Sequence, residues 1–142
     1  MPYCRYYIMN AMADIFSEVI GVESVTRSYK EVDMTAYNEA DLPLVEIQEP
    51  FETADVEATS QHQVMLLDVK LRIWFADWCE EPSFVYEGLL KAIRDTLGNN
   101  FNLNGTATAC WVTEVTKVEG ETPLYHFDLT LRTKYWLNQR SN

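Results

Sequence analysis

Two long segments of the chain alternate between apolar and polar residues, which is the pattern of a β-strand with one buried face. In the segment Val64–Ala76, the apolar phase is Met65, Leu67, Val69, Leu71, Ile73 and Phe75, and the other phase includes Asp68, Lys70, Arg72 and Trp74. In the segment Tyr125–Leu137, the first phase is Tyr125, Phe127, Leu129, Leu131, Thr133, Tyr135 and Leu137, and the other is His126, Asp128, Thr130, Arg132, Lys134 and Trp136. Each segment predicts a long, half-buried strand.

Two other segments repeat apolar residues at the three- to four-residue spacing of an amphipathic helix. The first runs from about residue 2 to Ile20 and is followed by Gly21. Its inward stripe is Ile8, Met12, Ile15, Phe16, Val19 and Ile20. The second, Pro82–Leu97, begins with a proline and is followed by Gly98, as helices often are. Its inward stripe is Val85, Leu89, Ala92, Ile93 and Leu97.

The remaining segments predict shorter strands and loops. The strands are Ser24–Tyr29, Leu42–Gln48 and Ala107–Val118, and a hairpin connection begins at Glu119–Thr122. The segments Lys30–Asp41 and Asn99–Gly105 are loops, and Glu49–Gln61 is an acidic connection that is functional, mobile or partly a short return strand. This order predicts an α+β fold, with two helices packed on one face of a mainly antiparallel sheet. Residues 1–142 are expected to form a single domain, with an acidic loop region at 30–62.

The composition is typical of a soluble globular protein. The chain has 142 residues, of which 47% are hydrophobic and 23% charged. Its apolar runs are far shorter than a membrane span and no signal peptide opens it, so neither secretion nor a membrane partner is expected. The three cysteines, Cys4, Cys79 and Cys110, are odd in number and share no CxxC spacing, which favours reduced thiols.

The net charge of −11 is concentrated in one segment. Nine acids and no Lys or Arg lie between Glu31 and His62, whereas the rest of the chain has 13 acids and 11 bases. Such a segment repels a phosphate backbone and argues against nucleic-acid binding. It is either a solvated loop, a negative surface past which DNA slides, or a decoy for a basic protein surface. The candidate acids for such a surface are Glu39, Asp41, Glu49, Glu52, Asp55 and Glu57.

The stretch RIWFADWCEEP (residues 72–82) ends in a cluster of potential ligands, Asp77, Cys79, Glu80 and Glu81. One hypothesis is a small metal-assisted or acid–base enzyme that uses this corner, with His62 or His126. The other is that the glutamates stabilise the start of the following helix, where the helix dipole is positive. The chain has no phosphate-binding loop and no GxSxG or HExxH motif. We therefore expect no catalytic residue, metal or cofactor.

The polar phase of the two long strands contains more than polar residues. Trp74 and Trp136 alternate there with basic side chains, and this mixture is typical of protein–protein interfaces. The predicted assembly surface is Arg72, Trp74, Arg132, Lys134 and Trp136. The alternative is that a helix covers this face and the tryptophans pack beneath it.

The order of segments resembles that of the tail terminator proteins of long-tailed bacteriophages, the lambda-like tail-tube terminator group. After the N-terminal helix, the segments that carry the resemblance are DLPLVEI (Asp41–Ile47), VMLLDVKLRIWF (Val64–Phe75), the acidic corner with Pro82, SFVYEGLLKAIRDTL (Ser83–Leu97) and ACWVTEVTKVEGETPLYHFDLTLRTKYWL (Ala109–Leu137). The resemblance covers nearly the whole chain and concerns the order and length of segments. It assigns no individual residue.

The resemblance implies a structural virion protein without enzymatic activity or cofactor. Such a protein forms a homohexameric ring that caps the tail tube, halts its polymerisation and offers a surface for joining the head connector. Its expected partners are further copies of itself, the tail-tube protein and the head–tail connector protein, with DNA passing through the lumen without specific binding. It is assembled in the cytoplasm of the host bacterium. A neighbouring neck or tail-completion protein of the same virion is the closest alternative.

Overall fold

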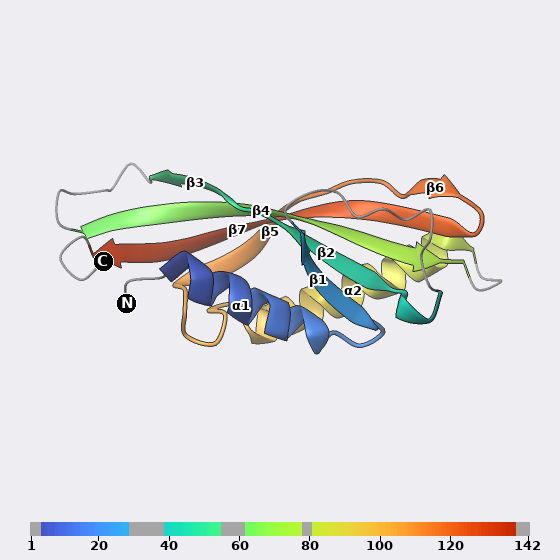
Figure 1. Cartoon of the computed structure of the whole chain (residues 1–142), viewed down its shortest axis with the longest axis horizontal. Coiled ribbons are helices and arrows are strands. Elements are labelled where there is room, and N and C mark those ends of the chain that lie inside the picture. Colours follow the sequence, from blue (N-terminus) through green and yellow to red (C-terminus); the bar gives the residue numbers. More distant parts are fainter. Residues whose placement is uncertain (1–3, 29–38, 55–61, 78–80, 139–142) are drawn as a thin grey trace.

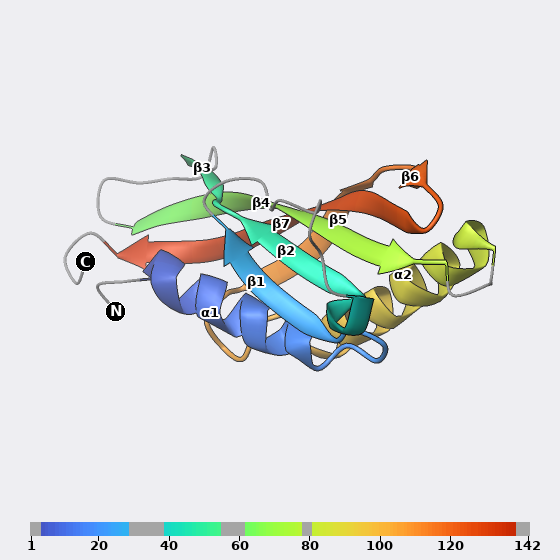
Figure 2. The same cartoon turned by 45° about the vertical axis from the view of Figure 1, so that its right-hand side comes forward.

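The described residues form a seven-stranded sheet with two α-helices on one of its faces (Figures 1 and 2). The computed structural model describes residues 4–28, 39–54, 62–77 and 81–138. Its elements in chain order are α1 (Cys4–Ser17), β1 (Ser24–Ser28), the 3₁₀ turn η1 (Glu39–Asp41), β2 (Leu44–Gln48), β3 (Phe51–Ala54), β4 (His62–Ala76), α2 (Pro82–Asn99), β5 (Ala109–Val115), β6 (Glu119–Glu121) and β7 (Leu124–Asn138). The predicted α+β class with a mainly antiparallel sheet is confirmed.

Strands β4 and β7 are the centre of the sheet. Each has 15 residues, and they pair antiparallel along their whole length, from His62 opposite Asn138 to Ala76 opposite Leu124. The strand order is β1-β2-β4-β7-β5, with β3 also paired to β4 and β6 to β7. Strands β1 and β2 run parallel, and the other described pairs are antiparallel.

The inward side chains of the long strands pack against both helices. The predicted inward phase of β4 is buried throughout, and in β7 the residues from Phe127 to Tyr135 in that phase are buried too. They share one core with Ile8, Met12, Ile15 and Phe16 of α1 and with Leu89, Ile93 and Leu97 of α2. Full burial of one large apolar side chain contributes roughly 1.5–3 kcal/mol. The alternation in the sequence therefore identified the core face of the sheet correctly.

Helix α1 ends earlier than its apolar pattern predicts. The N–H groups of Glu18 and Val19 donate to carbonyl oxygens three residues back, so a tight turn replaces the last helical turn. Val19 is still buried, but Ile20 is 86% exposed. The prediction that Ile20 faces the core is wrong, because helical spacing no longer sets side-chain direction once the helix has ended.

The shorter elements differ from the prediction at their ends. Strand β5 begins and ends inside the predicted 107–118, and its register shifts between Val112 and Glu114 at a bulge. The acidic connection contains a short return strand, β3, one of the predicted alternatives, and its residues 55–61 lie outside the described part of the chain. The loop after α2 is anchored by Leu103, which is fully buried and has a positive φ of 50°.

The described residues also bear on two further predictions, one about the cysteines and one about a membrane span. Cys110 is a free, buried thiol, and burial raises its pKa; Cys79 and the side chain of Cys4 lie outside the described part. No described helix combines the length and apolar character needed to cross a membrane.

Gly120 in β6 supports a testable prediction about the β6–β7 hairpin. Its φ is +123°, and a Cβ atom there would lie 2.5 Å from the carbonyl oxygen of Leu124. We expect Gly120→Ala to lower the free energy of unfolding by about 1–3 kcal/mol in urea titrations. The control is Gly98→Ala in α2, where the Cβ meets open space and alanine favours the helix. Equal stability of Gly120→Ala and wild type would contradict the prediction.

Candidate assembly surface

The five predicted assembly residues lie on the sheet face opposite the helices. Arg72 and Trp74 belong to β4, and Arg132, Lys134 and Trp136 belong to β7. All five occupy the phase that alternates with the buried inward residues. We call this side of β3, β4, β5 and β7 the outer face. No described helix lies over it (Figure 1).

Both arginines of the outer face are engaged by carboxylates on the opposite strand. Arg132 holds Asp68 through two hydrogen bonds, Nε to Oδ1 at 2.8 Å and Nη2 to Oδ2 at 3.0 Å. Arg72 holds Asp128 in the same two-pronged way at 2.8 and 3.2 Å. Lys70 Nζ lies 3.3 Å from Asp128. Two-pronged arginine–carboxylate pairs are geometrically demanding, so these side chains hold the two central strands together.

The charges around Asp128 change its protonation behaviour. Burial by itself raises the pKa of this carboxyl, but the hydrogen bonds and positive charges of Arg72 and Lys70 outweigh burial and lower the pKa below its ordinary value. A fully buried carboxylate, Glu46, stands opposite Arg72 on the next strand, β2. The row Glu46–Arg72–Asp128 therefore runs across three strands.

Trp74 does not contribute an exposed ring to the outer face. Its exposed fraction is 9%, because it packs with Leu42 and Ala76 and contacts Leu44 and Leu124. Its ring lies 4.7 Å from that of His126. The inclusion of Trp74 among the exposed assembly residues is therefore wrong. The covering residues come from β4 itself, from the neighbouring strands β2 and β7 and from the residue Leu42 before β2. The alternative hypothesis, in which a helix covers the tryptophan, is therefore wrong as well for Trp74.

Among the described residues, three other aromatic side chains are exposed on the outer face: Phe51 at 67%, Trp111 at 41% and Trp136 at 56%. We call them the aromatic patch. Phe51 stands opposite Asp68, and Trp111 stands opposite Arg132, so one row across four strands has an aromatic residue at each end and an ion pair between them. Trp136 lies four residues beyond Arg132 on the same strand, about 13 Å away at the usual strand rise.

Sequence reasoning identified only Trp136 of this patch. Trp111 lies between the apolar residues Cys110 and Val112 in strand β5. The alternation of this short strand would have placed Trp111 on the face opposite Cys110, which is buried. Phe51 follows a proline inside the acidic connection and is placed by its pairing with β4, which no local pattern encodes.

The structure describes the side chains of three of the six predicted acidic residues, and two of these three have partners within the chain. Asp41 is exposed, Glu49 pairs with Arg27 at 3.2 Å, and Glu52 accepts a hydrogen bond from Tyr135 Oη and lies 4.0 Å from Arg5. Glu46, counted among the nine acids of the segment, is buried. The side chain of Glu39, and Asp55 and Glu57 as whole residues, lie outside the described part.

The corner before α2 has the geometry of a helix start, as far as it is described. Glu81 is the N-cap residue, and its carbonyl oxygen accepts from the N–H groups of Phe84 and Val85. Its side chain makes no capping hydrogen bond. The N–H group of Asp77 donates to the carbonyl oxygen of Pro123 at 3.3 Å. Trp78, Cys79 and Glu80 lie outside the described residues.

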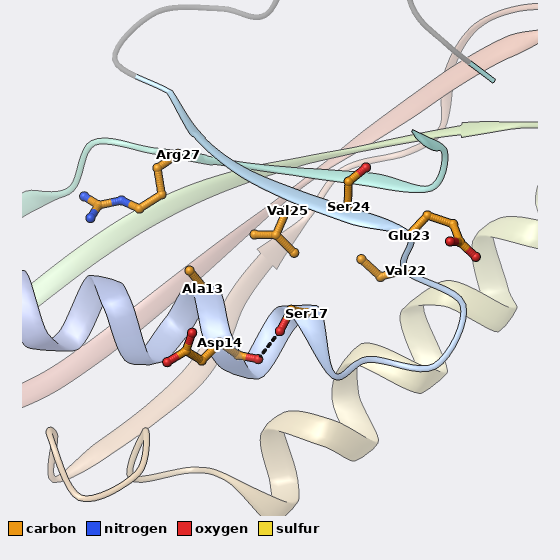
Figure 3. Close-up of a pocket in the computed structure, with 8 residues that line it drawn as sticks. All are labelled: Ala13, Asp14, Ser17, Val22, Glu23, Ser24, Val25 and Arg27. Atoms are coloured by element: carbon orange, nitrogen blue, oxygen red, sulfur yellow. Dashed lines mark hydrogen bonds between the residues drawn. The ribbon is translucent and has the colours of Figure 1, made fainter. Parts of the chain in front are cut away.

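The described residues hold no cluster of three or more His, Cys, Asp or Glu side chains placed to bind a metal ion. His126 Nε2 lies 3.8 Å from Glu119 Oε2, and the side chain of His62 is outside the described part. A pocket of about 280 Å³ between α1 and β1 carries Asp14, Glu23 and Arg27. Figure 3 shows these three side chains spread along the pocket rather than converging on one point.

Comparison with known proteins adds no assignment to this geometry. The sequence matches no protein-family model, and a search of curated proteins gives no significant match.

The lowered pKa of Asp128 predicts a pH-dependent contribution to stability. A lowered pKa in the folded state stabilises the protein above the pKa of an unfolded aspartate, about 3.9, and this stabilisation is lost as the pH falls through the lower folded value. We expect Asp128→Asn to lower the free energy of unfolding by about 1–3 kcal/mol at pH 7. The difference between variant and wild type should shrink towards pH 3.

Asp95→Asn is the matched control, because Asp95 pairs with Lys91 on the exposed side of α2. Its effect at pH 7 should be much smaller, since exposed pairs are screened by solvent. A stability difference for Asp128→Asn that stays constant between pH 7 and pH 3 would contradict the assigned role of Asp128.

Proposed function

We propose that this protein is a structural subunit of the virion of a long-tailed bacteriophage, a tail terminator that acts by self-assembly. Copies of the chain associate into a homohexameric ring that caps the tail tube. The ring stops polymerisation of the tail-tube protein and offers a surface for joining the head–tail connector protein. The function involves no catalytic step and no cofactor.

The aromatic patch is the observation that carries this proposal. Phe51, Trp111 and Trp136 come from three strands and expose large rings on one face. Exposed aromatic groups beside arginine are the residue types that dominate binding energy at protein interfaces. Because the arginines of this face are already held by their own chain, the face is rigid before a partner arrives, which lowers the entropy lost on binding.

The fold supports the same function. The element order and the α+β class agree with the segment layout on which the resemblance to tail terminators rests. A ring is built by a head-to-tail contact in which one surface of each copy meets a different surface of the next. The aromatic patch is well suited to be one of these two surfaces.

The charge distribution supports passage of DNA rather than binding. The chain carries a net charge of −11, and acids such as Asp41 and Glu49 are exposed. Carboxylates that line the lumen of a ring repel the phosphate backbone, so that DNA crosses without adhering. Assembly takes place in the host bacterial cytoplasm, and the finished ring resides at the neck of the virion.

Purified protein and tail-tube protein provide the direct test. We expect a hexamer in native mass spectrometry, or a monomer that assembles at the end of a tube, and electron micrographs in which added protein caps the tubes and limits their length. A stable monomer that neither binds tubes nor changes their growth would refute the proposal. Binding to the connector without binding to tubes would instead identify a neighbouring neck protein.

The aromatic patch yields a sharper prediction through Trp136→Ala. Loss of one central aromatic contact in each interface should raise the concentration needed for half-maximal assembly at least tenfold. Phe101→Ala is the matched control, because Phe101 is 55% exposed but lies outside the patch. Light scattering over a dilution series measures both variants, and equal behaviour of the two would contradict a role for the patch.

A further inference from the structure

A second apolar feature lies on the helix side of the molecule. It is a groove of about 310 Å³ lined by Ile20 and Gly21 after α1, by Pro43 before β2, and by Phe84, Gly88 and Leu89 of α2. Ile20 and Phe84 are among the most exposed large apolar side chains of the described residues. We call it the apolar groove. Its volume is that of roughly ten water molecules, which is enough space for an aromatic side chain.

Four exposed acidic residues lie close in sequence to residues that line the apolar groove. Glu18, Glu23, Asp41 and Glu87 are all exposed and lie within two residues of a lining residue. The only base at a similar separation is Lys91, which is paired with Asp95 at 2.7 Å. An occupant of the groove should therefore combine an apolar group with positive charge.

The outer face has the complementary character. It carries four bases, Lys70, Arg72, Arg132 and Lys134, against three acids, Asp68 and Asp128 on the central strands and Glu114 on β5. In a chain with a net charge of −11, this makes the outer face around the aromatic patch locally positive. Trp136 lies two residues from Lys134 on the same strand and the same side.

Trp136 and the apolar groove lie towards opposite ends of the molecule. The end of β7, which carries Trp136, is at one end, whereas the start of α2 and the start of β2, which line the groove, are at the other (Figures 1 and 2). They also lie on opposite faces of the sheet. Surfaces placed in this way join copies head to tail, and such a contact closes into a ring or continues as a filament.

We propose that the apolar groove of one copy receives the aromatic patch of the next copy, with Trp136 as the inserted side chain. The contact rests on the proposed self-assembly and supplies the second surface that assembly requires. The acids around the groove face the bases of the incoming outer face, so assembly weakens as salt is raised.

A substitution at Gly88 can fill the groove without disturbing the fold. A Cβ atom at Gly88 would meet nothing within 4 Å, and the same holds for Gly98 later in α2. A longer side chain at Gly88 fills the groove, while replacement of glycine inside a helix favours folding. Gly88→Gln should therefore abolish assembly with an unchanged or raised melting temperature. Gly98→Gln, with the same chemical change in the same helix but outside the groove, should assemble as wild type does.

Mixing two defective variants tests the pairing itself. Trp136→Ala has an intact groove and a defective patch, and Gly88→Gln has the reverse. At a protein concentration at which wild type assembles but Trp136→Ala does not, each variant alone is expected to remain monomeric. An equimolar mixture should form a dimer and nothing larger in native mass spectrometry, because it contains a single productive combination of patch and groove.

The outcomes separate this contact from the proposed function. If wild type forms rings but the mixture forms no dimer, or if Gly88→Gln assembles normally, the contact is overturned and ring assembly stands. If wild type is monomeric both in solution and on tail tubes, the proposed function and the contact fail together. A dimer that forms in the mixture and dissociates as the salt concentration is raised supports the contact between the aromatic patch and the apolar groove.

Discussion

The antiparallel pairing of β4 with β7 is the constraint on which the rest of the structure depends. Because side chains alternate between faces, a slip of one residue would exchange the core positions with the outer positions. Ion pairs oppose a slip of two residues, which the alternation alone would permit. Asp68 stands opposite Arg132, and Arg72 stands opposite Asp128. A two-residue slip in one direction would place Lys70 opposite Arg132, and in the other direction Arg72 opposite His126. The order of charges along both strands thus specifies a single register.

Local sequence patterns predicted the long strands and the second helix well, because their period repeats over enough residues to be unambiguous. These patterns gave the wrong burial where contacts with a distant part of the chain determine whether a side chain is exposed. Trp74 shares the phase of Arg72, yet it is buried because Leu42 and Leu124 cover it. Alternation assigns a side chain to a face but does not say what lies over that face. Ile20 shows the corresponding limit for helices, since its direction depends on where the helix ends.

The candidate surface was predicted only in part, because local alternation does not show which distant strands lie next to each other. Its basic residues and Trp136 follow from the phase of two strands, whereas Phe51 and Trp111 join them only through pairing between strands distant in sequence. The outer face combines two kinds of residue with different tasks. Its charged groups are mostly engaged with one another and make the sheet stiff, and its aromatic rings remain available for contact. Stiffness and exposed apolar area together favour a specific interface over nonspecific adhesion.

The position of β7 has a consequence for how the protein is made. This strand follows the other described elements in sequence, but it occupies the middle of the sheet between β4 and β5. While the ribosome is still synthesising β7, strands β4 and β5 lack the strand that lies between them, and inward residues such as Leu67 and Leu71 lack the contacts that β7 supplies. The nascent chain therefore exposes its apolar strands until β7 has left the ribosome, a situation in which chaperones commonly bind. Long-range pairing of this kind also slows folding, so low temperature and slow expression should improve the yield of native protein.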